Sequence, residues 1–242
     1  MAKVMASPKR SARRSEIDFF EKLDVKAAYA LGVKTSLPFF FLAAIFLSVS
    51  TGFGQNKVKP AQEVDFFKKL AEAAEARTKE SVRYDPAYFV LKYPGGDVPA
   101  DTGVCTDVVI RTYRALGIDL QELVHEDMKA NFSKYPKNWE LKRADKNIDH
   151  RRVPNLQRYF ERTGAKLPIS QKAADYQVGD LVAWDLNNKG LWHIGVVVGD
   201  DKFVHNIGSG PIYDTGIAGW KIVGHYRFKP KGWEPVAKKK VE

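Results

Sequence analysis

Apolar residues recur at helical spacing through the middle of the chain. Val64, Phe67 and Ala71 share one face of a helix that the pattern predicts over 62–82. The segment 131–152 is polar and aromatic without a clear period, which is typical of a long loop or lid. The same helical periodicity predicts three further helices, over 101–116, 119–129 and 153–163.

Near residue 180 the pattern changes to short apolar runs separated by turn residues. Strands are predicted over 181–185, 193–198, 202–206 and 221–228. The segments 187–190 and 199–201 have the Gly, Asn and Asp content of tight turns. Helices followed by an antiparallel meander predict the α+β class, with the helices packed on a small antiparallel sheet.

The N-terminal part of the chain has a different pattern. Residues 1–36 form a basic leader with eight Lys/Arg and four Asp/Glu, and 37–49 is an apolar run without a charge. We expect 37–54 to be a signal-peptide core or a membrane anchor, with a buried helix of the folded domain as the alternative. Either membrane interpretation exports the domain over 55–228 and the basic tail over 229–242. The expected location is the periplasm or cell envelope, with anchoring to the inner membrane if the apolar run is not cleaved.

Composition narrows the classes of function. The chain has 242 residues, 44% of them hydrophobic, and a formal charge of +10. A single cysteine excludes an intramolecular disulfide and a cysteine-cluster zinc site. A basic chain can bind nucleic acid, anionic lipid or an anionic wall polymer, or simply carry solvated lysines. No nucleic-acid-binding motif is present, so we expect no nucleic-acid partner, and we expect no cofactor or metal.

The candidate chemistry centres on that cysteine. Cys105 opens the predicted helix over 101–116, where the helix dipole favours thiolate over thiol. His193 begins one strand and His205 lies near the end of its neighbour, so the hairpin brings them together with Cβ atoms about 5 Å apart. A helix packed across that end of the sheet would complete a Cys–His–His row. The alternatives are an inert core cysteine and a metal pair of histidines, for which no third ligand has suitable spacing.

The sequence resembles the NlpC-type papain-like cysteine peptidases, which include many bacterial cell-wall hydrolases. Four features carry the resemblance: Cys105 and the blocks 179–184, 193–199 and 203–206. It implies a papain-like fold with the nucleophile, Cys105, at a helix N-terminus, His193 as the base and His205 as the residue that orients it. The blocks 103–111, 119–128 and 148–156 look more closely like an exported bacterial family of unassigned function in the same superfamily.

The chain also departs from that family. An acidic residue usually precedes the cysteine and Ser-Gly follows it, whereas here Val104 precedes Cys105 and Thr106-Asp107 follow. The acidic side chain therefore sits two positions later, and its role stays open. The insert over 131–152 predicts a different substrate pocket.

Further residues are candidates for supporting or lining the cleft: Asp107, Asn206, Asp101, Tyr93 and Trp192. Asn206 is the rival of His205 for the orienting role, because alternation along a strand sends the two side chains to opposite faces. Asp101 is a candidate cap of the helix that carries the cysteine, with Thr102 as its alternative. Arg151 and Arg152 can bind a substrate carboxylate or brace their loop.

These features predict an exported cysteine hydrolase that cleaves an amide or peptide bond, with peptidoglycan or its peptide fragments as the partner. Two alternatives stay open: a non-catalytic module that binds the cell envelope, and a thiol acyltransferase. The expected oxyanion stabiliser is a backbone N–H at the start of the helix, that of Cys105 itself.

Overall fold

The computed structural model describes residues 60–235, with side chains from residue 65 onward. The predicted leader, the apolar segment 37–54, the first residues of the predicted domain and the end of the basic tail lie outside this range. No helix in the described part of the chain has the length and apolar character needed to cross a membrane.

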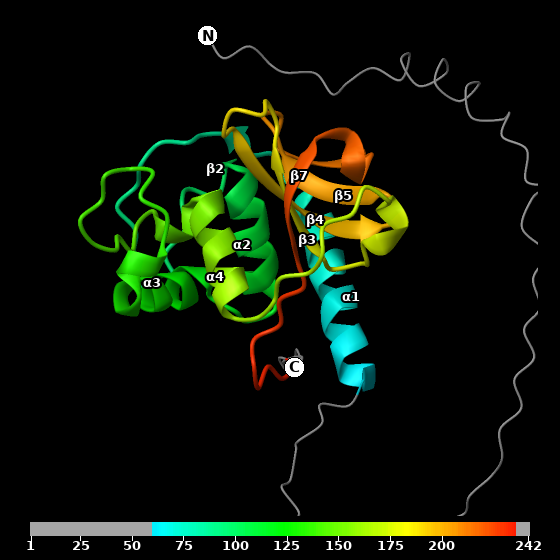
Figure 1. Ribbon diagram of the computed structural model, residues 1–242, viewed down its shortest axis with the longest axis horizontal. Helices are drawn as coiled ribbons and strands as arrows, with labels where there is room; N and C mark the ends of the chain where they lie inside the picture. Colours follow the sequence, from blue (N-terminus) through cyan, green and yellow to red (C-terminus); the bar gives the residue numbers. More distant parts are fainter. Residues whose placement is uncertain (1–59, 236–242) are drawn as a thin grey trace, which may run out of the picture. The chain divides into compact units, whose positions relative to one another are not determined.

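Residues 60–235 contain four α-helices and a five-stranded antiparallel sheet, which confirms the predicted α+β class (Figure 1). The helices are α1 (Pro60–Arg77), α2 (Cys105–Ala115), α3 (Leu120–Ala130) and α4 (Val153–Arg162). Short 3₁₀ turns are η3 (Phe132–Lys134), η4 (Asp149–Arg151), η5 (Ala173–Asp175) and η6 (Ile217–Gly219).

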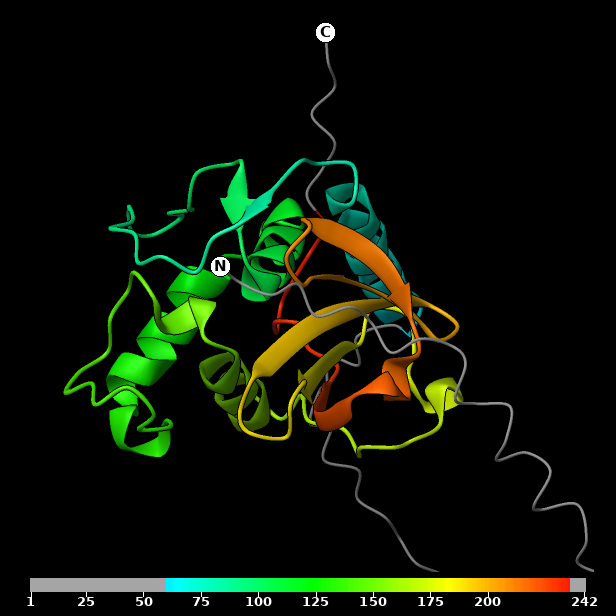
Figure 2. The same ribbon diagram turned by 90° about the horizontal axis from the view of Figure 1, so that it is seen from above.

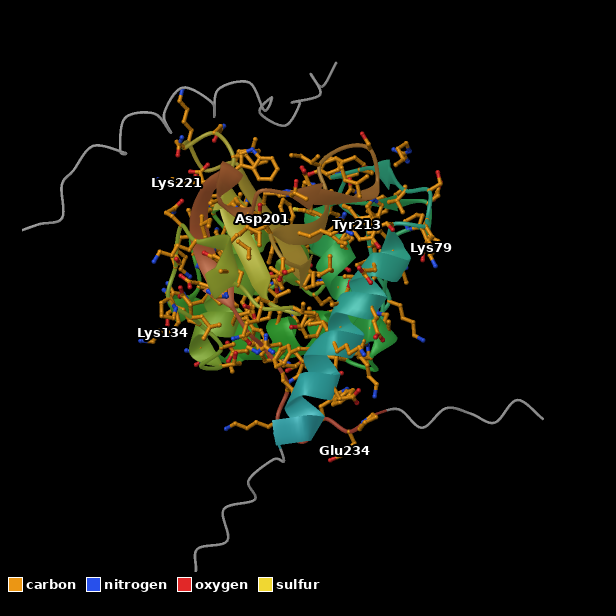
Figure 3. All side chains as sticks on the ribbon, turned by 90° about the vertical axis from the view of Figure 1, so that its right-hand side faces the viewer. Lys79, Lys134, Asp201, Tyr213, Lys221 and Glu234 are labelled. Atoms are coloured by element: carbon orange, nitrogen blue, oxygen red, sulfur yellow. The ribbon has the colours of Figure 1, made fainter. Side chains whose placement is uncertain are left out.

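The sheet has the strand order β6-β5-β4-β3-β7. Its strands are β3 (Leu181–Asp185), β4 (Trp192–Gly199), β5 (Lys202–Asn206), β6 (Pro211–Thr215) and β7 (Lys221–Tyr226). The pattern missed β6, an edge strand whose burial alternates and which begins with a proline. Proline is tolerated there because an edge strand needs fewer ladder hydrogen bonds. Figure 3 labels Tyr213 on this strand and Asp201 in the turn before β5.

The two faces of the sheet are covered differently. Helices α1 and α2 pack on one face, where Ile194, Val196 and Val204 join their apolar residues in the main core (Figure 2). The other face carries a smaller cluster that includes Trp184 and Phe203. Because both faces are covered, every residue of β3 is buried, and its first four residues form a continuous apolar run instead of an alternating one.

A separate two-stranded parallel pair leads into α2. Its strands are β1 (Arg83–Tyr84) and β2 (Thr102–Gly103). This pairing holds the two residues before Val104 in an extended conformation, so the chain turns into the helix only at Cys105. It thereby determines where the N-terminus of α2 lies.

Candidate active site

Cys105 is the first residue of α2 and is only 5% exposed. The predicted start of this helix at Asp101 is wrong, because the pairing of β2 keeps the preceding residues extended. The predicted caps are wrong as well: Asp101 is exposed, and the Asp107 carboxylate accepts a 2.7 Å hydrogen bond from the N–H of Val104. Asp107 thus stabilises the turn that presents the cysteine.

A buried ion pair fixes that turn to the rest of the domain. The Arg151 guanidinium donates two 3.0 Å hydrogen bonds to the Asp107 carboxylate and further ones to the carbonyls of Ala87 and Asp85. Both charged side chains are almost fully buried. Asp107, the acidic residue two positions after the cysteine, therefore has a structural role as the partner of Arg151.

Asn206 braces the same turn from the sheet side. Its side-chain amide donates a 3.2 Å hydrogen bond to the carbonyl of Gly103, and its oxygen accepts from the N–H of Gly208. It makes no hydrogen bond to His193 among the described residues. Of the two predicted candidates, His205 is the one that contacts His193.

His193 and His205 form a buried pair, with 2.7 Å between Nε2 of His193 and Nδ1 of His205. The contact is diagonal instead of directly cross-strand, because the register pairs Val196 with Val204 and so brings His205 opposite Gly195. A Cβ at Gly195 would lie 2.9 Å from the Val204 carbonyl oxygen and 3.3 Å from the His205 Cβ. Because Gly195 has no side chain, the two imidazoles have the space to contact each other.

The thiol reaches the start of β4 from the other face of the sheet. His193 and His205 lie beside the rings of Trp184, Phe203 and Trp220, on the face away from α2. The backbone N–H of Ile194, the residue after His193, lies close enough to the Cys105 thiol to lower its pKa against the effect of burial. Because consecutive Cα atoms are about 3.8 Å apart, the sulfur and the His193 backbone meet at the same point of the strand.

Burial keeps all three groups neutral in this form of the site. It raises the pKa of the Cys105 thiol to about 12, although the Ile194 N–H acts in the opposite direction. It lowers the pKa of His193 to about 3, with the charge of His205 adding to the effect, and that of His205 to about 4. Desolvation therefore outweighs the helix dipole that the sequence led us to expect to favour the thiolate.

The histidines predict how stability depends on pH. Their folded-state pKa values lie below the unfolded value of about 6.5, so the unfolded chain binds more protons between about pH 6.5 and 3. The free energy of unfolding should be fully maintained above pH 6.5 and fall towards pH 3. Urea unfolding of the wild type and of His193→Gln would measure this, and the variant should show the smaller pH slope. Equal slopes would contradict the assignment.

A cleft of about 190 Å³ opens beside the cysteine. Its lining includes Cys105, the expected Trp192 and Arg152, and also Trp139 and Tyr84, the last of which the sequence did not single out. Trp139 comes from the predicted loop or lid, so the insert does contribute to this pocket.

Tyr93 does not line this cleft, contrary to the sequence-based expectation. Its hydroxyl donates a 2.6 Å hydrogen bond to Glu126, and its ring packs against His125. Burial raises its pKa above the ordinary tyrosine value. Tyr93 therefore belongs to the contact between its loop and α3.

Metal binding was the alternative use of the two histidines. Within residues 65–235, no three His, Cys, Asp or Glu side chains come together as a metal site. The described residues thus offer no third ligand beside the imidazole pair.

Comparison with known proteins finds a sequence relative and solved structures that align with this chain. The uncharacterized protein YijF of Escherichia coli (strain K12) is 51% identical over 165 residues, which cover 66% of this chain and 80% of YijF. The solved structure of NlpC1 from Trichomonas vaginalis aligns with a TM-score of 0.38 at 17% identity. That alignment covers 67% of this chain and 44% of the other, so the chain spans less than half of its length.

A protein-family model also matches residues 71–228, which include the cysteine, both histidines and the cleft. The matched family is described as a domain of unknown function, DUF1287. The match covers well over half of the chain, and the chain belongs to this family.

Proposed function

We propose that the domain is a cysteine hydrolase that cleaves an amide or peptide bond in peptidoglycan. The observation that carries the proposal is the 2.7 Å contact between His193 and His205, at the start of the strand whose Ile194 amide lies near the thiol of the helix-opening Cys105. Cys105 is the nucleophile, His193 the base and His205 the residue that orients it. The NlpC-like residue pattern supports the reaction class, and the apolar segment 37–54 supports export.

The protonation states of the histidine pair follow from their contact. Two neutral imidazoles 2.7 Å apart share one hydrogen. If Nε2 of His193 donates it to Nδ1 of His205, Nδ1 of His193 is left as an acceptor on the opposite side of its ring. That nitrogen can take the proton of a thiol. The tautomer that makes His193 a base is thus the one that the contact with His205 stabilises.

The reaction then needs no charged resting state. The Cys105 sulfur attacks the carbonyl carbon of the substrate while its proton passes to Nδ1 of His193. This transfer requires the imidazole to turn toward the thiol from the opposite face of the sheet, where it lies beside Trp184. The N–H of Cys105 has no intrahelical acceptor, since it is the first in α2, and it stabilises the oxyanion. The imidazolium protonates the leaving amine as the C–N bond breaks. Water, activated by the same histidine, hydrolyses the thioester, which releases a carboxylic acid and restores the thiol.

A carboxylate lies behind the histidine pair. With Nδ1 accepting from His193, His205 carries its own proton on Nε2, a fully buried atom without a hydrogen-bond partner among the described residues. The Asp214 carboxylate on β6 lies 3.7 Å from that nitrogen, and its charge raises the pKa of His205 against the effect of burial. Asp214 is therefore a positioning residue that favours the imidazolium formed during the reaction.

We expect Asp214→Asn to lower kcat about tenfold, with KM unchanged. Because the carboxylate raises the pKa of His205, its loss should also move the acid limb of the pH–rate profile to lower pH. Asp200→Asn, in the exposed turn before β5, is the matched control and should leave both unchanged. An acid limb that does not move in Asp214→Asn would refute this role.

A second candidate function is supported by the buried, neutral thiol. A non-catalytic module that binds the cell envelope needs the cleft and its tryptophans but not a reactive Cys105. The two functions differ in their products. Purified full-length protein is incubated with peptidoglycan, and the soluble fragments are analysed by mass spectrometry. Hydrolysis yields new amine and carboxylate ends with the mass of one added water, whereas a binding module sediments with the polymer and releases nothing.

A further inference from the structure

The charged side chains that line the cleft beside Cys105 are all positive. Its lining contains two arginines and no acidic side chain. The charge of Arg151 is neutralised by Asp107, and its guanidinium is fully engaged with that carboxylate and with backbone carbonyls. Arg152 is thus the charged residue of the described lining that has no ion-pair partner.

Arg152 is held in place without using its hydrogen-bond donors. Its guanidinium lies over the Trp139 ring, 4.1 Å from the ring centroid, and forms no hydrogen bond or ion pair with any residue in 65–235. Its Nη1 is buried and unpartnered. The acids that act on it through space, Asp145 and Asp149, are engaged by Tyr88 and His125. A planar fork of unused donors, already partly desolvated, suits a carboxylate.

The position of Arg152 in the fold adds a second cationic element. Arg152 is the N-cap of α4, without a side-chain capping bond, and the first turn of this helix has no acidic residue. Helix N-termini favour Ser, Thr, Asp or Asn at the N-cap and acidic residues in the first turn, because the helix dipole is positive there. Val153 and Pro154, the first residues of α4, line the same cleft. An arginine at the positive end of the helix dipole lowers the stability of the helix. Residues that are locally unfavourable in this way are concentrated at functional sites.

We propose that Arg152 and the N-terminus of α4 form a subsite for a free carboxylate of the substrate, which places a carboxylate-bearing peptide in the cleft beside Cys105. This inference rests on the proposed function and specifies its substrate class. The carboxylate supplies the negative charge that α4 lacks, and Trp139 holds the guanidinium plane in position to receive it. Two sources carry this group in a peptide: the C-terminal carboxylate and an internal side-chain carboxylate.

Binding tests the subsite separately from catalysis. Soluble peptidoglycan stem peptides are titrated calorimetrically into the full chain carrying Cys105→Ala, which prevents turnover. Adding Arg152→Gln should weaken binding roughly 10- to 100-fold, the range for losing a hydrogen bond to a charged group. Arg152→Lys, which keeps the charge but loses the fork, should fall between the two. Arg143→Gln removes an exposed arginine of the neighbouring loop and should bind as the parent does.

Thermal unfolding shows whether Arg152 has a merely structural role. Arg152→Gln should keep or raise the Tm, because it removes a positive charge from the positive end of α4. Two synthetic forms of one stem peptide, amidated either at the C-terminal carboxylate or at the internal ones, identify the source, since only one amidation should abolish binding. The titrations with the two amidated peptides need no variant of Arg152, so they remain informative if a variant folds poorly.

The outcomes separate this inference from the proposed function. Three results would overturn the subsite, even if the wild type hydrolyses peptidoglycan. The stem peptide does not bind, it binds equally well to Arg152→Gln, or it still binds after either amidation. Arg152-dependent binding by a wild-type protein that releases no fragments keeps the subsite and overturns the hydrolase.

Discussion

Peptidoglycan hydrolysis should fall by at least about 10³-fold when Cys105 is replaced by alanine, because the proposed reaction has no other nucleophile. The chain contains no second cysteine that could take over. Residual hydrolysis would come only from binding the substrate beside the oxyanion-stabilising N–H. The rate of release of new amine ends from purified peptidoglycan measures the effect.

Two variants separate loss of chemistry from loss of folding. Cys105 is buried, so its truncation should cost about 1 kcal/mol of stability, which leaves the protein folded. Cys105→Ser keeps the size of the side chain and should be as inactive as the alanine variant, since the buried hydroxyl is a poorer nucleophile than the thiol. Comparable hydrolysis by wild type and Cys105→Ala would exclude the thiol mechanism.

Asp107→Ala should lower the free energy of unfolding by about 3–5 kcal/mol and the Tm by roughly 6–20 °C. The substitution leaves the Arg151 guanidinium buried without its carboxylate and also removes the acceptor of the Val104 N–H. Both losses fall on the turn that presents Cys105, so hydrolysis should decline below the unfolding temperature as well. Urea and thermal unfolding, followed by circular dichroism, measure the stability change.

The size of this effect depends on burial, which the controls test. Asp101→Ala removes an exposed aspartate a few residues earlier and should change stability by less than about 0.5 kcal/mol. Asp107→Asn keeps an acceptor for the Val104 N–H but not the charge, and should lie between the two. Adding Arg151→Met to Asp107→Ala removes the unpaired charge and should recover part of the loss. A Tm for Asp107→Ala equal to that of Asp101→Ala would contradict a structural role for the pair.

Much of the fold was predictable because local patterns carry it. Helical periodicity predicted all four helices of the described chain, and short apolar runs predicted four of the five sheet strands, β3, β4, β5 and β7. The edge strand β6 was not predicted, since Pro211 is its only buried residue and no apolar pattern marks the segment. The start of α2 was misplaced because pairing between β1 and β2, distant in sequence, overrides the local capping preference of Asp101.

The sequence by itself determined the class of the fold, the cysteine at the start of a helix and the two strand histidines, since each depends on periodicity or on residue type. Only the tertiary structure decided that the imidazoles meet diagonally past Gly195, that Asn206 and Asp107 brace the cysteine turn, and that Tyr84, Trp139 and Arg152 line the cleft. Most of these features are contacts between segments far apart along the chain, and their energies depend on burial. A local sequence pattern does not show which partner a charged group has in the folded protein or how strongly that group is desolvated.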